Sequence, residues 1–112
     1  MNIERLRPLP LFKEAFSLSR EKYIIDKSGC YVLTTFPGTI LYIGLAKNLR
    51  RRMHDHLNSP EKTNVTPLGR AIYFHWIESE ALNKLERTWL NIHLENDGVL
   101  PIMNKIYSPT SI

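Results

Sequence analysis

The sequence contains a single cysteine, Cys30, among its 112 residues. One cysteine cannot form an intramolecular disulfide or a metal site built from several cysteines. No apolar run approaches the roughly 18 residues of a membrane span, and charges and prolines interrupt the amino-terminal segment where a signal peptide would be apolar. We therefore expect a cytoplasmic protein that has no disulfide and no membrane anchor.

The sequence also has only a small excess of positive charge, with 15 Lys and Arg residues, 11 Asp and Glu residues and a formal net charge of +4. Such a surplus permits a polyanionic partner, but it is common among proteins that bind no nucleic acid. The sequence lacks internal repeats and linker-like tracts, so its length predicts one compact domain.

The apolar periodicity predicts an ordered set of elements. They are a helix over 11–23, a β-hairpin over 30–35 and 40–43, a helix over 46–57, a strand over 71–77 and a helix over 80–95. A helix that long would end at the turn-forming Asn96-Asp97-Gly98. The order predicts an α+β fold, a small three-stranded antiparallel sheet flanked by helices.

The hairpin places two tyrosines close together. If Pro37-Gly38 fills the two central positions of a type II turn, residue 35 pairs with 40, 33 with 42 and 31 with 44. Because side chains alternate along strands, Tyr31 and Tyr42 then lie on one face as diagonal neighbours. Taken alone, this pattern is equally that of an ordinary core, since aromatic residues suit strands.

Two helical patterns carry polar side chains beside their buried stripes. Arg52 and His56 are four residues apart and flank the apolar stripe of helix 46–57. Glu86 falls within the apolar arc of helix 80–95, where a carboxylate is costly without a cation or donors beside it. The alternatives are a solvated basic helix and a half-exposed glutamate at the edge of the stripe.

Six positions, the five named above and Asn104, occur in an order that resembles the GIY-YIG nuclease family. Gly29-Cys30-Tyr31 is similar to the first motif and Tyr42-Ile43-Gly44 to the second, and the further matching residues are Arg52, His56, Glu86 and Asn104. Leu45 stands where some members carry lysine, so no role for that lysine transfers. The resemblance covers residues 29 to about 105 and implies a nuclease-like domain over 29–112, preceded by a helical extension over 1–28.

The resemblance implies an endonuclease that hydrolyses phosphodiester bonds in DNA with one divalent ion, Mg²⁺ or Mn²⁺. Glu86 is the expected metal ligand, Arg52 the phosphate-binding cation, and Asn104 a support for Glu86 or for the backbone of the site. Tyr31 is the candidate proton acceptor, provided that the metal and Arg52 favour its phenolate, and Tyr42 and His56 assist it.

Further basic residues are expected to contact phosphates, namely Lys47, Arg50 and Arg51, with Lys62 and Arg70 as additional candidates. Nothing in the sequence resembles a module for reading bases, so we expect low intrinsic sequence specificity, or recognition of a DNA shape, or specificity supplied by a second copy of the chain or a partner subunit. RNA is not excluded as a substrate. Two other interpretations stay open: a nucleic-acid-binding module that has lost turnover, and a small structural protein that uses the tyrosines as core.

Overall fold

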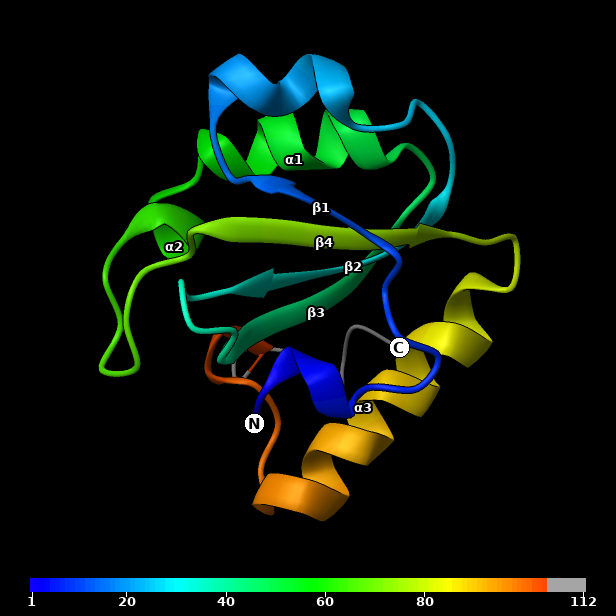
Figure 1. Ribbon diagram of the computed structural model, residues 1–112, viewed down its shortest axis with the longest axis vertical. Helices are drawn as coiled ribbons and strands as arrows, with labels where there is room; N and C mark the ends of the chain where they lie inside the picture. The colour runs from blue at the N-terminus through cyan, green and yellow to red at the C-terminus, as the bar shows by residue number, and fades with distance from the viewer. Residues whose placement is uncertain (105–112) are drawn as a thin grey trace.

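The computed structural model describes residues 1–104 and is built around a four-stranded antiparallel sheet (Figure 1). The strand order is β1-β4-β2-β3. The strands are β1 (Phe12–Ala15), β2 (Gly29–Thr34), β3 (Ile40–Ala46) and β4 (Tyr73–Glu78). The α-helices are α1 (Leu49–Leu57), α2 (Pro60–Thr63) and α3 (Leu82–Asp97), and the 3-10 helices are η1 (Ile3–Arg5), η2 (Leu18–Tyr23) and η3 (Ile102–Asn104).

The α+β class is confirmed, but the prediction of three strands is wrong. The segment 11–23, expected to be a helix, forms the edge strand β1 and then the 3-10 helix η2. Phe12 pairs with Trp76 of β4, and their rings stack at 5.6 Å between centroids. The spacing of apolar residues fitted a helix, but pairing with the otherwise open side of β4 overrides this local preference.

The predicted pairing of the hairpin is confirmed where it matters for the tyrosines. Leu33 pairs with Tyr42, and Tyr31 pairs with Gly44. The turn itself differs from the prediction, because the Gly38 amide donates to the Thr35 carbonyl at 3.1 Å and Phe36-Pro37 therefore occupies the central positions. The register shifts between Leu33 and Thr34, so residue 40 pairs with 34 and not with 35.

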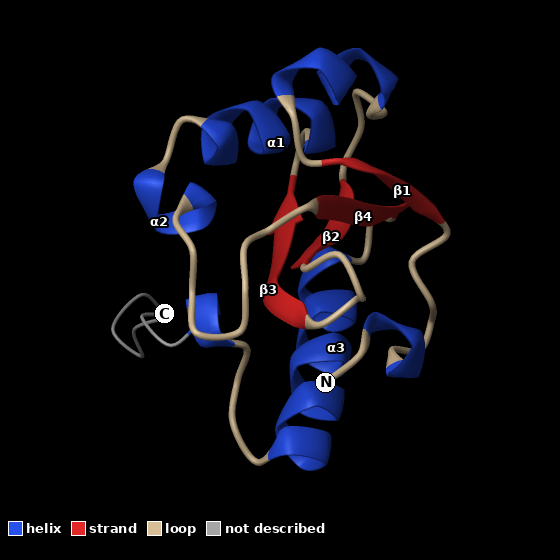
Figure 2. Ribbon diagram, turned by 60° about the vertical axis from the view of Figure 1, so that its left-hand side comes forward, coloured by secondary structure: helices blue, strands red, loops and turns tan. Residues whose placement is uncertain are grey.

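Helices cover both sides of the sheet (Figure 2). On one side, which we call the α1 face, Tyr31, Leu33, Phe74 and Trp76 pack with Leu49 and Met53 of α1. On the other, the α3 face, Cys30, Val32 and Ile43 pack with Trp89 of α3. The amino-terminal segment contributes to both layers, since Ile24 is buried on the α1 face and Leu6 on the α3 face.

The ends of the helices follow from local chemistry. α1 begins at Leu49, later than predicted, because Ala46 still belongs to β3 and the Asn48 side chain accepts from the Arg51 amide at 3.0 Å. α3 runs from Leu82 to Asp97, two residues later at each end than predicted, and Gly98 of the predicted turn is its C-cap at a φ of 76°. Among the described residues no helix is long and apolar enough to cross a membrane. The cytoplasmic location stays a prediction, and residues 105–112 of the expected nuclease domain lie outside the described residues.

Candidate active site

Three aromatic rings meet on the α1 face beside the edge strand β3. The ring centroids of Tyr31 and Tyr42 are 5.9 Å apart, and the His56 ring lies 5.5 Å from Tyr31 and 5.6 Å from Tyr42. The Tyr31 hydroxyl oxygen and His56 Nε2 are 2.5 Å apart, a short hydrogen bond. Tyr31 is 0% exposed and stacks on Phe74, whereas Tyr42 is only partly buried. The structure therefore brings these predicted residues together and puts Tyr42 on the solvent side.

The motif glycine Gly44 makes this arrangement possible. A Cβ atom at this position would lie 2.6 Å from the Tyr31 hydroxyl and 2.8 Å from the Tyr42 ring. Gly29, at the start of β2, is equally constrained, because a Cβ there would lie 2.3 Å from the Ile77 carbonyl oxygen. Both glycines thus provide room for close approach, one to the tyrosines and one to the neighbouring strand.

Arg52 approaches both phenols from α1. Its Nη1 donates to the Leu45 carbonyl at 3.4 Å, which holds the guanidinium beside the end of β3. Burial raises the pKa of Tyr31 well above its usual value, with Tyr42 adding to the rise and Arg52 opposing it. Burial also raises the pKa of Tyr42, while the Tyr31 hydroxyl and Arg52 lower it. Burial raises the pKa of Tyr31 more than Arg52 lowers it, so Arg52 alone does not favour the Tyr31 phenolate.

Lys62 of α2 also belongs to the site, although the sequence did not show that it lies beside Tyr42. It is 8% exposed, and its ammonium nitrogen lies 4.6 Å from the centroid of the Tyr42 ring, a cation–π contact. Burial lowers the pKa of Lys62. Burial, and then the charges of Lys62 and Arg52, lower the pKa of His56 to about 3, so that imidazole is neutral. In the sequence Lys62 lies in a polar segment after helix 46–57, where no periodicity indicates which lysine turns inward.

Glu86 belongs to α3 and is half-buried, which fits both an inward carboxylate and a half-exposed glutamate at the edge of the stripe. Burial raises the pKa of Glu86, and its negative charge raises the pKa of Tyr42 and of Cys30. Glu86 lies on α3, across the sheet from the helix that carries Arg52 and His56, and its charge effect on Tyr42 is what links it to the tyrosines. Its membership in the site stays a prediction.

Asn104 of η3 is 5% exposed and holds the backbone of the second motif. Its Nδ2 donates to the Ile43 carbonyl at 3.0 Å, and its Oδ1 accepts from the Ile43 amide at 2.9 Å. Ile43 lies between Tyr42 and Gly44 on the outer strand β3. Asn104 was expected to support either Glu86 or the backbone of the site, and its hydrogen bonds go to the backbone.

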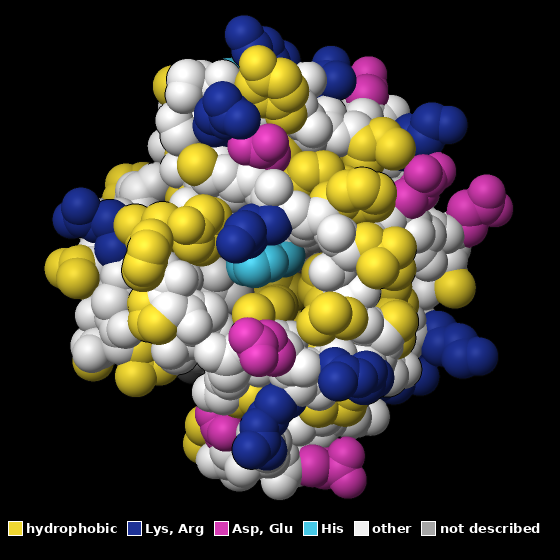
Figure 3. Space-filling view, in the orientation of Figure 1, with side chains coloured by type: hydrophobic (Ala, Val, Ile, Leu, Met, Phe, Trp, Pro, Cys, Tyr) yellow, Lys and Arg dark blue, Asp and Glu magenta, His cyan; other side chains and the backbone are white. Residues whose placement is uncertain are grey.

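The other basic residues are spread out. Lys47 and Arg51 are exposed, but Nε of Arg50 donates to the Ile24 carbonyl at 2.9 Å and so ties the amino-terminal segment to α1. Arg70 is exposed in the loop before β4. On the face shown in Figure 3, Lys and Arg side chains alternate with Asp and Glu and do not gather into one patch. A role of these residues in binding phosphates stays a prediction.

The sequence model of the GIY-YIG catalytic domain family matches residues 27–97, which is more than half of the chain. Among curated proteins, the chain is similar to UvrABC system protein C of Dictyoglomus thermophilum, with 27% identity over 88 residues and 70% of this chain covered. The protein of the same name from Streptococcus pyogenes serotype M5 is 28% identical over 89 residues, which is again 70% of this chain. That from Mycoplasmoides gallisepticum is 35% identical over 48 residues, or 43% of this chain.

These matches cover only 15% of the length of the Dictyoglomus and Streptococcus proteins and 8% of the Mycoplasmoides protein. The similarity therefore concerns one domain of longer chains. The matched range includes the tyrosine pair, Arg52, His56 and Glu86, while Asn104 follows it. Motif order, the sheet with its helices and the family model agree, and the chain belongs to the GIY-YIG family.

Proposed function

We propose that this protein is an endonuclease that hydrolyses phosphodiester bonds in DNA with the help of one divalent metal ion. The observation that carries the proposal is the meeting of Tyr31, Tyr42 and His56 with two cations, Arg52 and Lys62. Neutral proton carriers beside fixed positive charges suit an anionic phosphodiester and the water that attacks it.

The proton from the attacking water goes to Tyr42 in this proposal, and not to Tyr31 as the sequence suggested. Tyr31 is 0% exposed, which keeps solvent from its oxygen, whereas Tyr42 is partly accessible. Nε2 of neutral His56 is hydrogen-bonded to the Tyr31 hydroxyl, and the ring centroids of Tyr31 and Tyr42 are 5.9 Å apart. Burial and Glu86 raise the pKa of Tyr42 more than Tyr31 and Arg52 lower it, so a Tyr42 phenolate that takes the proton as water adds to phosphorus would also require the positive charge of the divalent ion.

The cations bind the phosphate from two helices. The guanidinium of Arg52 offers a planar set of donors that matches two phosphate oxygens, and Leu45 holds it in place. Lys62 adds a single partly desolvated charge over the ring of Tyr42. Because both charges are fixed before the substrate arrives, they stabilise the extra charge of the transition state with little reorganisation.

The donor set fits a hard divalent ion. Within residues 1–104 no three His, Cys, Asp or Glu side chains gather closely enough to enclose a metal. Glu86 therefore offers one carboxylate, which suits Mg²⁺ or Mn²⁺, since these ions keep most of their waters. Such an ion would neutralise charge on the phosphate and on the departing oxygen. Asn104 keeps the backbone beside Tyr42 in place through Ile43.

The assay that tests the proposal is cleavage of supercoiled plasmid and of a branched DNA in Mg²⁺, Mn²⁺ or EDTA, with an RNA of the same sequence in parallel. We expect metal-dependent nicking by the wild type. Glu86→Gln, Arg52→Ala and Tyr42→Phe should each reduce the rate by about 10²–10³-fold, the scale of losing one transition-state contact. Glu95→Gln is the matched control, because Glu95 is an exposed glutamate of the same helix.

Wild-type rates in Glu86→Gln and Arg52→Ala would contradict the assignment of the site. If the wild type binds DNA but cuts no substrate in any metal, the alternative of a non-catalytic binding module replaces the enzyme. Cleavage of RNA alone would change the substrate and leave the site intact. We also propose a second copy of the chain or a partner subunit as a source of specificity.

A further inference from the structure

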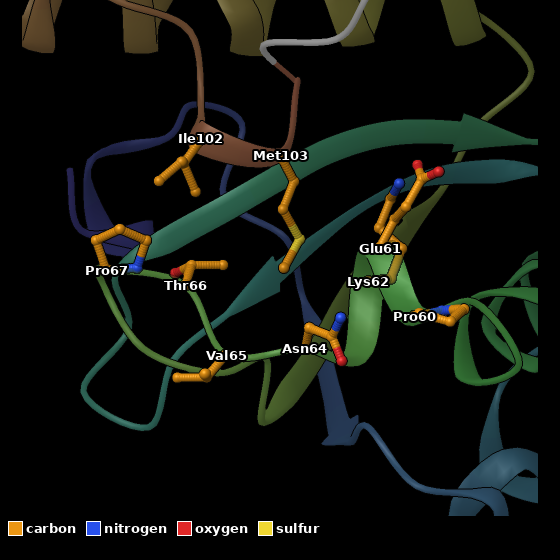
Figure 4. Close-up of a pocket in the computed structure, with 9 residues that line it drawn as sticks. All are labelled: Pro60, Glu61, Lys62, Asn64, Val65, Thr66, Pro67, Ile102 and Met103. Carbon is orange, nitrogen blue, oxygen red and sulfur yellow. The ribbon is translucent and has the colours of Figure 1, made fainter.

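A pocket of about 380 Å³ opens beside the candidate site (Figure 4). One wall is formed by α2 and the loop that follows it, residues 60–67, and the other by Ile102 and Met103 of η3. Its size is in the range of small-molecule sites in proteins, and it is large enough for one nucleobase.

Both walls of the pocket continue into the candidate site. Lys62 lines the pocket and also places its ammonium 4.6 Å from the centre of the Tyr42 ring. On the opposite wall, Met103 directly precedes Asn104, which holds Ile43 of the second motif. A phosphate bound between Lys62 and Arg52 therefore has this pocket as its immediate neighbour.

The chemistry of the walls suits a flat, partly polar ring. Val65, Pro67, Ile102 and Met103 offer apolar surface, and Asn64 and Glu61 bring an amide and a carboxylate to the lining. In Figure 4 these side chains surround one space from both walls. Ligand sites are usually apolar with a few polar groups, and here the polar groups of Asn64 and Glu61 are available to pair with the edge of a base.

The loop wall is braced before any ligand arrives. Thr66 and Gly69 exchange two backbone hydrogen bonds of 3.0 and 2.9 Å, and the Thr66 hydroxyl also donates to the Gly69 carbonyl at 2.7 Å. Gly69 has a φ of 123°, which favours glycine. A wall fixed in this way binds a ligand without a large loss of conformational freedom.

We propose that this pocket binds the base of an unpaired nucleotide next to the phosphate that is cleaved, with Lys62 holding that phosphate. The inference rests on the proposed function and narrows its substrate class. A paired base enters a pocket only after it is unpaired and unstacked at a cost in free energy, so the preferred substrate has an unpaired nucleotide beside the cleaved bond.

The experiment measures binding and cleavage separately. The Glu86→Gln variant is titrated with three DNAs: a full duplex, a duplex with one unpaired 2-aminopurine, and the same duplex with an abasic residue at that position. We expect the unpaired base to bind about 10-fold more tightly than the abasic residue, the scale of contacts to one base, and its fluorescence to change on binding. The wild type should cut the DNA with the unpaired base fastest.

The matched variants are Val65→Asp, which puts a carboxylate into the apolar lining, and Leu11→Asp, which adds the same charge far along the chain. Val65 is 67% exposed and Leu11 69% exposed, so neither change should prevent folding. Val65→Asp should remove the preference for the base over the abasic residue, and Leu11→Asp should keep it.

A preference that is absent in the Glu86→Gln protein, or that persists in Val65→Asp, would overturn the pocket assignment while metal-dependent cleavage still stands. Conversely, if no DNA is cut by the wild type but the unpaired base is still preferred, the proposed enzyme fails and the pocket remains a base-binding site.

Discussion

The two faces of the sheet differ in what they bury. On the α3 face, Val32 and Ile43 pack against Trp89, and the buried polar pair of Thr34 and His75 is satisfied by its own hydrogen bond at 2.8 Å. On the α1 face, Tyr31 contacts the polar side chain of His56, and Lys62 lies over the ring of the partly exposed Tyr42. Polar groups cost free energy when they are buried, and those of the α1 face surround an accessible ring, so we expect changes there to affect cleavage more than stability. Testing the comparison requires changes on each face.

The largest effect on stability is expected on the α3 face. Trp89 is 0% exposed, and its Nε1 donates to the Pro8 carbonyl at 2.9 Å. Trp89→Ala should lower the free energy of unfolding by about 3–5 kcal/mol, because it leaves a cavity in the layer. Tyr31→Phe, which keeps the ring on the α1 face, should change stability by less and reduce cleavage more. Urea denaturation measures the stability of both variants, and the plasmid assay measures their cleavage. If Tyr31→Phe lost more stability than Trp89→Ala, or less cleavage, the proposed difference between the faces would be wrong.

A smaller effect is expected where the two faces meet, at the edge of β3. Asn104→Leu keeps the volume but leaves the amide and carbonyl of Ile43 without their partner. We expect a loss of about 1–3 kcal/mol, the range for a buried polar group left unsatisfied, together with slower cleavage. Asn91→Leu, at an exposed position of α3, serves as the control. Equal stability of the two variants would show that the Asn104 amide does not support the strand.

The most gradual effect is the response to pH, in which we compare one histidine from each face, half-buried His56 and buried His75. Burial, followed by its charged neighbours, lowers the pKa of His56 to about 3 and that of His75 to about 4. An unfolded chain has histidines near 6.5, so below that pH it binds protons that the folded chain does not. The stability from both groups is complete above about 6.5 and declines as pH falls towards 4 and then 3.

Urea midpoints at pH 7.5, 6.5, 5.5 and 4.5 would measure this decline. His75→Gln removes the titrating group opposite Val32 and should make the curve shallower, and His56→Gln should do the same on the α1 face. A curve that is flat from pH 7.5 to 4.5 in the wild type would contradict the neutral state of both histidines. A slope lost in only one variant would assign the sensitivity to one face.

Local patterns predicted the part of the fold that carries the motifs. Alternation along the hairpin placed Leu33 opposite Tyr42 correctly, even though the turn differed, because the bulge lies beyond these pairs. The apolar arc of α3 placed Glu86 beside the buried stripe, where it is half-buried, a state that also fits a glutamate at the edge of the stripe. In both cases the relevant contacts are set within one element or one pair of neighbouring strands.

The missed features depend on contacts between distant segments. Phe12 forms a strand because β4 is available for pairing, which the spacing of apolar residues cannot reveal. Lys62 became part of the site because α2 folds back over Tyr42, and its sequence neighbours give no sign of this. The hydrogen bonds of Asn104 to Ile43 span 61 residues. Such long-range contacts are decided by the whole fold and not by local preference.

The contact between Asn104 and Ile43 has a consequence for self-association. β3 is an outer strand of the sheet, and the free amide and carbonyl groups of an outer strand can pair with another chain in an extended, aggregating ribbon. Here one side-chain amide occupies both groups of Ile43 in the middle of that strand. The residue that steadies the strand beside Tyr42 thus also shields it against edge-to-edge stacking of neighbouring molecules.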